Sequence, residues 1–199
     1  MMIKQREVKD YEAYKYEQGG KARNIPDKFL KTTDRRIKGF ISVFQKAAPY
    51  MNAGYQVLCL GARTGCEVEA AIKCGFPLSV GIDLHPLSGN VIEADWHYMP
   101  FRDNAFQNVF TNSLDHCADL KKLAHEIRRV LGMDGVFVFT ATDRSTMEYE
   151  QWAKKPNNEY LFWDNPDGLR MAFEGYGFEF KYKVRLGKKP ILYVMRVCK

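Results

Sequence analysis

The sequence has no long hydrophobic run, since no stretch of about eighteen apolar residues occurs anywhere in it. It also lacks an internal repeat, a low-complexity tract and an evident linker, which predicts a single globular domain. The charged start MMIKQREVKDYE is unlike a signal peptide. The five cysteines form no C-x-x-C pair, so we expect reduced, mostly buried thiols in a cytoplasmic protein.

The composition excludes few classes of function. With 46% hydrophobic and 27% charged residues, the 199-residue chain is ordinary for a soluble globular protein, and no membrane partner is expected. The formal net charge of +6 is spread along the chain. That charge permits a nucleic-acid partner but does not demand one.

Strand-like and helix-like segments alternate along the chain. Apolar runs predict parallel strands at 56–60, 78–82, 91–94, 108–112 and 135–140. Helical spacing predicts helices at 34–48, with Thr33 as N-cap, at 66–74, with Ile72 facing inward, at 119–131 and at 166–174. The strands expected at 178–184 and 191–197 are joined by so short a link that they must be antiparallel. This pattern predicts a three-layer α/β sandwich whose sheet of six to seven strands is mostly parallel, with an antiparallel C-terminal strand.

The most informative stretch is VLCLGARTGCEVEAAIKCGFPLSVGIDLHP, at residues 57–86. An apolar strand leads to Gly61 and Gly65 and then to a helix, and a second apolar strand ends in Asp83. Glycine lets the backbone approach a ligand, the helix N-terminus offers N–H groups, and a strand-end acid is placed to bind ribose hydroxyls. The order of these parts indicates an enzyme that uses an adenosine-type cofactor.

Four motifs then extend the pattern: VLCLGARTG at 57–65, GIDL at 81–84, EADWHYMPF at 93–101, and FTNSLDH at 110–116 followed by EIRRVLGMDGVFVF at 126–139. In this order the chain resembles the class I S-adenosylmethionine-dependent methyltransferases over about residues 56–139. The resemblance implies a Rossmann-like fold and S-adenosylmethionine as cofactor. It divides the single domain, 1–199, into an N-terminal lid or helical segment at 1–50, a cofactor-binding core at 55–142, and an insertion with a C-terminal helix and hairpin at 143–199.

The resemblance also implies roles for individual residues, with Asp83 on the ribose and Asp95 on the adenine amino group. The implied cofactor contacts are Gly61, Ala62, Arg63, Gly65, Asp83, Leu84, Asp95, Trp96, Asn112 and Ser113. Two positions depart from the family pattern, because Cys59 stands where an acid is frequent and Arg63 where a glycine is common. We expect Arg63 either to face the cofactor's carboxylate in compensation or to point to solvent.

Methyl transfer from a sulfonium is a direct displacement, so the protein mainly aligns the reacting groups and excludes water. A general base is needed only if the acceptor must lose a proton. His116, beside Asp115, is the first candidate for that base, with packing against the cofactor or capping of a helix as its alternative role, and His97 is the second candidate. The cluster around Cys117 and Asp119 matches no established spacing of metal ligands, so we expect no metal.

The leading function is methyl transfer to a small acceptor that bears oxygen or nitrogen. The alternatives are an RNA methyltransferase, a dehydrogenase and a non-catalytic relative that serves as a scaffold. NSLDH is not the Asn/Asp-Pro-Pro-aromatic motif of base amino-methylating enzymes, and the lack of G-x-G-x-x-G disfavours a dehydrogenase. We expect segments 11–28 and 143–163 to enclose the acceptor, because their aromatic and basic residues suit a partly apolar carboxylate or phosphate.

Overall fold

A seven-stranded sheet forms the centre of the computed structural model, which describes residues 1–6, 10–16, 32–154, 159–188 and 190–198. The strands follow the order β4-β3-β2-β5-β6-β9-β8. Their bounds are β2 (Val57–Leu60), β3 (Val80–Asp83), β4 (Val91–Glu93), β5 (Phe106–Thr111), β6 (Leu131–Thr142), β8 (Phe178–Arg185) and β9 (Pro190–Val197). Strands β2 to β6 are parallel, and β9 is antiparallel to both of its neighbours. The predicted mostly parallel sheet with a reversed C-terminal strand is confirmed.

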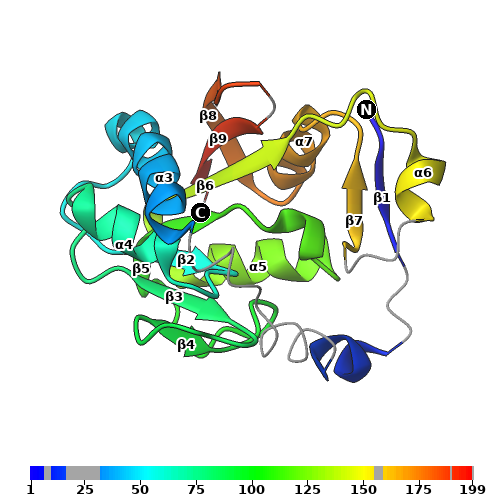
Figure 1. Ribbon diagram of the computed structural model, residues 1–199. Coiled ribbons are helices and arrows are strands. Elements are labelled where there is room, and N and C mark those ends of the chain that lie inside the picture. The colour runs from blue at the N-terminus through cyan, green and yellow to red at the C-terminus, as the bar shows by residue number, and fades with distance from the viewer. Residues whose placement is uncertain (7–9, 17–31, 155–158, 189, 199) are drawn as a thin grey trace.

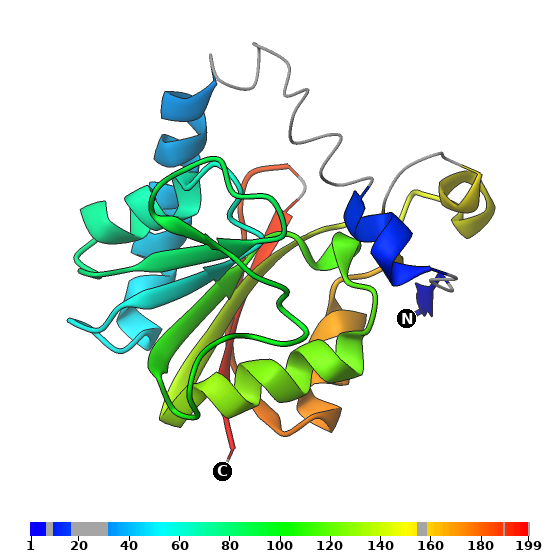
Figure 2. The ribbon, with the colours of Figure 1, turned by 90° about the horizontal axis from the view of Figure 1, so that it is seen from below.

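Helices cover both faces of the sheet, which gives the three predicted layers (Figure 1, Figure 2). One face carries α3 (Thr33–Ala47), followed by the 3₁₀ turn η1 (Ala48–Tyr50), and α4 (Cys66–Lys73), whereas α5 (Leu120–Val130) and α7 (Asp167–Gly175) pack on the other. Helix α5 shows why the sequence folds this way locally. Asp119 caps its N-terminus by accepting a hydrogen bond from the Lys122 N–H at 2.9 Å, and Leu123 and Ile127 on its inner face are fully buried.

The cysteines lie as expected, since Cys59, Cys66 and Cys117 are buried, Cys74 is half-buried, Cys198 is exposed, and all five are free thiols. Among the described residues, no helix combines the length and the apolar character needed to cross a membrane.

Three local predictions are wrong. Leu78 is 88% exposed with a φ of 57°, so the strand begins only at Val80, after a turn. Ile72 is 46% exposed, because the buried face of α4 is centred on Ala70 and Ala71 and leaves Ile72 at its rim. The N-cap of α3 is Thr32 rather than Thr33, and its side chain makes no capping hydrogen bond.

A small unit beside the main sheet was not predicted. Strand β1 (Ile3–Gln5) pairs antiparallel with β7 (Leu161–Trp163), and α6 (Tyr149–Ala153) lies beside them (Figure 1). The Arg6 guanidinium lies 4.1 Å from the centre of the Trp152 ring and donates to the Trp152 carbonyl at 2.8 Å. The N-terminus therefore contacts the segment that follows β6, whose described part contains a helix and a strand that the sequence did not predict.

Candidate functional site

Two cavities with a shared wall residue, Arg36, lie where the parallel strands end. The first cavity has a volume of about 280 Å³. Its walls are Tyr14, Arg36, Gly61, Arg63, Ile82, Asp83, Leu84, Ala94, Trp96, Ser113 and His116. Six of the ten residues expected to contact a cofactor thus line this one cavity: Gly61, Arg63, Asp83, Leu84, Trp96 and Ser113. Asn112 lines the second cavity, whereas Ala62, Gly65 and Asp95 are not among the wall residues of either.

The loop after β2 needs glycine at two positions. Gly61 has a φ of 71°, and a Cβ added to it would lie 3.1 Å from the Ser113 Cβ and 3.6 Å from the Trp96 ring. The Gly61 N–H donates to the Ile82 carbonyl at 2.8 Å, which ties the loop to β3. Gly65 also has a φ of 71° and forms the N-cap of α4. The loop is therefore a tight turn, and Gly61, which has no side chain, leaves space free at the wall of the first cavity.

Asp83 stands at the end of β3 and is only 8% exposed. One carboxylate oxygen accepts from the Arg63 N–H at 3.1 Å, and the other accepts from the His85 N–H at 2.9 Å. The Arg63 Nε lies 3.4 Å from that second oxygen and forms an ion pair with it. One of the two expected orientations had Arg63 pointing to solvent. The structure does not show that orientation, because the guanidinium pairs with Asp83.

His97 is buried and holds Asp95 in place. Its Nδ1 lies 3.0 Å from the Asp95 carboxylate and 3.0 Å from the Tyr11 hydroxyl, while its Nε2 accepts from the Asp119 N–H at 3.3 Å. Burial alone would raise the pKa of Asp95, but the hydrogen bonds from His97 and Tyr11 together lower it. His97, the second candidate for a base, is thus hydrogen-bonded at both ring nitrogens and is not among the wall residues of either cavity.

Cys59 stands in the strand position where the family frequently has an acid. Its thiol is electrically neutral, because Cys59 is fully buried and burial raises the pKa of the thiol. Glu67 in the first turn of α4 is a buried acid, 2% exposed, whose charge acts on Cys59, and it is not among the wall residues of either cavity. Arg36 of α3 lies 3.8 Å from the Glu67 carboxylate and donates to the Thr64 hydroxyl at 3.0 Å. Burial raises the pKa of Glu67, and Arg36 opposes that rise. Sequence reasoning missed both Arg36 and Glu67, because neither lies in a motif position that signals a role.

His116 and Asp115 both belong to the 3₁₀ turn η2 (Leu114–His116), yet they line different cavities. His116 lines the first cavity, and Asp115 lines the second. The Asp115 carboxylate lies 3.3 Å from the Arg144 guanidinium, which also lies 3.2 Å from Glu159. Burial raises the pKa of Asp115, with Glu159 adding to the rise and His116 and Arg144 opposing it.

The second cavity has a volume of about 600 Å³. It is bounded by α3, by the ends of β5 and β6, and by the turn between β8 and β9; its walls are Arg36, Gly39, Phe40, Ser42, Val43, Lys46, Asn112, Asp115, Thr140, Ala141, Thr142, Arg144, Trp163, Leu186, Gly187 and Pro190. Residues 143–163 thus reach this cavity through Arg144 and Trp163. Trp152, by contrast, is 1% exposed and belongs to the interior of the β1–β7 unit.

The N-terminal part of the expected enclosure is described only in part, since residues 17–28 lie outside the described residues. Residues 11–16 are helical and reach the site through two tyrosines. Tyr14 lines the first cavity, and its ring packs edge-on against Tyr160 with centroids 4.7 Å apart. Tyr11 bonds to His97, as described above.

Comparison with known proteins finds a methyltransferase domain in this chain. Residues 58–139 match a family model described as a methyltransferase domain. A curated relative is an uncharacterised protein of Methanocaldococcus jannaschii, 26% identical over 127 residues, and the match covers 59% of this chain. The chain spans about half the length of that relative.

Solved structures share the fold at low sequence identity. An S-adenosylmethionine-dependent methyltransferase of Aquifex aeolicus superposes with a TM-score of 0.66 at 16% identity, covering 87% of this chain and 98% of its own. The 1,6-didemethyltoxoflavin-N1-methyltransferase of Burkholderia thailandensis, solved with 1,6-didemethyltoxoflavin and S-adenosylhomocysteine, gives a TM-score of 0.70 at 13% identity and covers 95% and 89%. The chain therefore contains a match to a methyltransferase domain at residues 58–139, and it shares the fold of solved S-adenosylmethionine-dependent methyltransferases.

Proposed function

We propose that the first cavity holds S-adenosylmethionine and that the second holds a small acceptor bearing oxygen or nitrogen. The observation that supports this arrangement is Arg36, which lines both cavities and therefore marks where their contents would meet. The space beside Gly61 fits an adenosine-type group, because any larger residue at this position would reach Ser113 and Trp96 across the cavity wall. Asp83 fits the ribose hydroxyls, since strand-end acids of such sheets accept hydrogen bonds from them.

When bound, S-adenosylmethionine supplies a methyl group activated on a sulfonium sulfur. The chain's own residues have the tasks of orientation and exclusion of water. Asp83 would orient the ribose, and Asp95, held by His97, would orient the adenine next to Trp96. Arg36, placed by Thr64 and Glu67, would face the amino-acid end of the cofactor in the absence of an acid at Cys59. His116 would accept a proton from the acceptor or orient it, with Asp115 beside it on the acceptor side.

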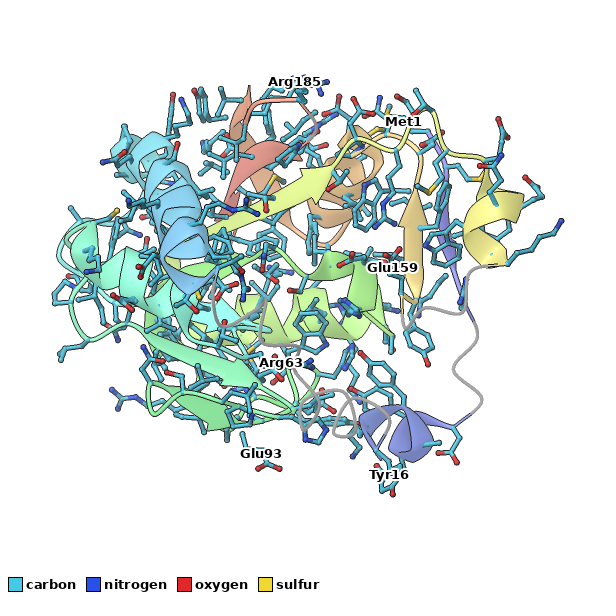
Figure 3. The ribbon with its side chains drawn as sticks, in the orientation of Figure 1. Met1, Tyr16, Arg63, Glu93, Glu159 and Arg185 are labelled. Atoms are coloured by element: carbon cyan, nitrogen blue, oxygen red, sulfur yellow. The ribbon has the colours of Figure 1, made fainter. Side chains whose placement is uncertain are left out.

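The ribose assignment is tested by Asp83→Ala. We expect the affinity for S-adenosylhomocysteine to fall by about 10- to 150-fold, the equivalent of about 1.5–3 kcal/mol for hydrogen bonds to a charged group. Glu93→Gln is the matched control, because Glu93 pairs with Asp83 in register across β3 and β4 but is exposed and not a wall residue of either cavity (Figure 3). Calorimetric titration measures both variants. Parent-like affinity in Asp83→Ala would remove Asp83 from the cofactor site.

For Arg63 we predict the opposite effect on cofactor affinity, namely tighter binding when its side chain is removed. Its guanidinium pairs with the carboxylate that the ribose needs, so cofactor binding must displace it. The Arg63 side chain is 27% exposed, and a pair of this kind is worth about 0.2–1 kcal/mol. We expect Arg63→Ala to bind S-adenosylhomocysteine up to about fivefold more tightly than the parent. Weaker binding by Arg63→Ala would instead make Arg63 a cofactor ligand, and the same titration decides between the two.

A further inference from the structure

The charges on the wall of the second cavity are mostly of one sign. Arg36, Lys46 and Arg144 are its cationic residues, and Asp115 is its single acid among the described residues. That acid lies 3.3 Å from Arg144 and forms an ion pair with it. Asp143, the first residue after β6, is likewise paired, with Arg185 at 3.0 Å. Asp115 and Asp143 therefore each have a cationic partner, and Arg144 is shared between Asp115 and Glu159.

Arg144 is the most deeply placed of the three cations, with only 8% of its surface exposed. Its Nη2 contacts Asp115 at 3.3 Å and Glu159 at 3.2 Å, and its guanidinium carbon lies 4.3 Å from the centre of the Trp163 ring. The other terminal nitrogen, Nη1, is buried and has no hydrogen-bond partner among the described residues. A buried guanidinium nitrogen without a partner is costly, and a small shift of the side chain that brought Nη1 to the cavity surface would let an acidic ligand relieve that cost.

Two fixed contacts orient this guanidinium before any ligand arrives. The carboxylates hold one edge of the fork, and the Trp163 ring supports its face. Because Nη2 already contacts two carboxylates, only the Nη1 edge of the guanidinium remains for a ligand, and its fixed orientation favours a carboxylate or phosphate oxygen over what a flexible lysine would offer. The remaining wall is apolar or aromatic at Phe40, Leu186 and Pro190, which suits a body that is not itself charged.

We propose that the methyl acceptor is a small, partly apolar molecule with a carboxylate or phosphate group, and that Arg144 binds this anionic group in the second cavity. This inference rests on the proposed function, because it takes the second cavity as the acceptor site. Arg144 is a specificity-determining residue in this scheme. It fixes the acceptor at its anionic end, so that the nucleophilic oxygen or nitrogen is turned toward the first cavity.

The test uses the full chain saturated with S-adenosylhomocysteine, into which benzoate, phenyl phosphate or the neutral benzyl alcohol is titrated by calorimetry. We expect at least one anion to bind saturably, and benzyl alcohol to bind at least about tenfold more weakly. The stronger of the two anions distinguishes a carboxylate acceptor from a phosphate acceptor. Equal binding of anions and alcohol, or no saturable binding of either anion, would overturn the proposal.

Variants of Arg144 test whether this residue binds the anionic group. We expect Arg144→Gln to weaken binding of the anion by about 10- to 100-fold and Arg144→Lys to weaken it less, with the affinity for S-adenosylhomocysteine unchanged. Arg185→Gln is the matched control, because Arg185 pairs with Asp143 but is half exposed and not among the wall residues of the cavity (Figure 3). Parent-like anion binding in Arg144→Gln overturns the inference alone. Failure of the parent to bind S-adenosylhomocysteine would overturn the proposed function as well.

Discussion

Gly61→Val is expected to abolish binding of S-adenosylmethionine and S-adenosylhomocysteine. The position has a φ of 71°, which a β-branched residue adopts only with strain, and its Cβ would lie 3.1 Å from the Ser113 Cβ. The valine methyl groups would also extend from the wall of the first cavity, where the proposed cofactor position requires close approach to the backbone. We expect no heat of binding at millimolar ligand, and a free energy of unfolding lowered by about 1–3 kcal/mol from backbone strain.

Gly54→Val is the control that distinguishes the effect of backbone strain from the effect of filling the cavity wall at Gly61. Gly54 has a φ of 78°, close to that of Gly61, but an added Cβ would meet no described atom within 4 Å. This control should therefore carry a similar loss of stability and still bind the cofactor with parent affinity. Denaturant unfolding and calorimetry on the two variants give the comparison. If Gly61→Val bound the cofactor as Gly54→Val does, the glycine loop would not belong to the cofactor site.

The central sheet could be predicted from the sequence because its signals are local. Buried parallel strands such as 57–60 and 136–139 are continuous apolar runs, and α5 has its own cap at Asp119. The β1–β7 pair could not be predicted in this way. Each strand has three residues, and Ile3 pairs with Trp163 across most of the length of the chain. No periodicity within a window contains that information.

The candidate site divides along the same line. Gly61 and Asp83 line the first cavity as expected, because their positions depend on the backbone at strand ends, which the motif order determines. The partners of Arg63, Asp115 and His97 were not predicted, because they depend on where long side chains turn after folding. Arg36 illustrates the limit most clearly. It lies on a helix far from the motifs in sequence, yet it lines both cavities.

His116→Ala is expected to lower turnover by about 10²–10⁴-fold at saturating cofactor if His116 accepts the acceptor's proton. The affinity for S-adenosylhomocysteine should change little. Turnover is measured as release of S-adenosylhomocysteine with an acceptor that supports activity in the parent. The opposite pattern, a loss of affinity with turnover preserved at saturation, would place His116 against the cofactor, whose cavity it lines.

Asp115→Asn is the comparison that decides which of the two neighbours takes the proton. Asp115 lines the proposed acceptor cavity, and burial raises the pKa of its carboxyl. If His116 is the base, Asp115→Asn should cost less than His116→Ala and leave the shape of the pH–rate profile unchanged. If Asp115 is the base, its substitution should be the more damaging of the two. Activity of the parent would then fall as the pH drops through the raised pKa of Asp115, because protonation removes the accepting carboxylate, and Asp115→Asn would abolish that limb of the profile.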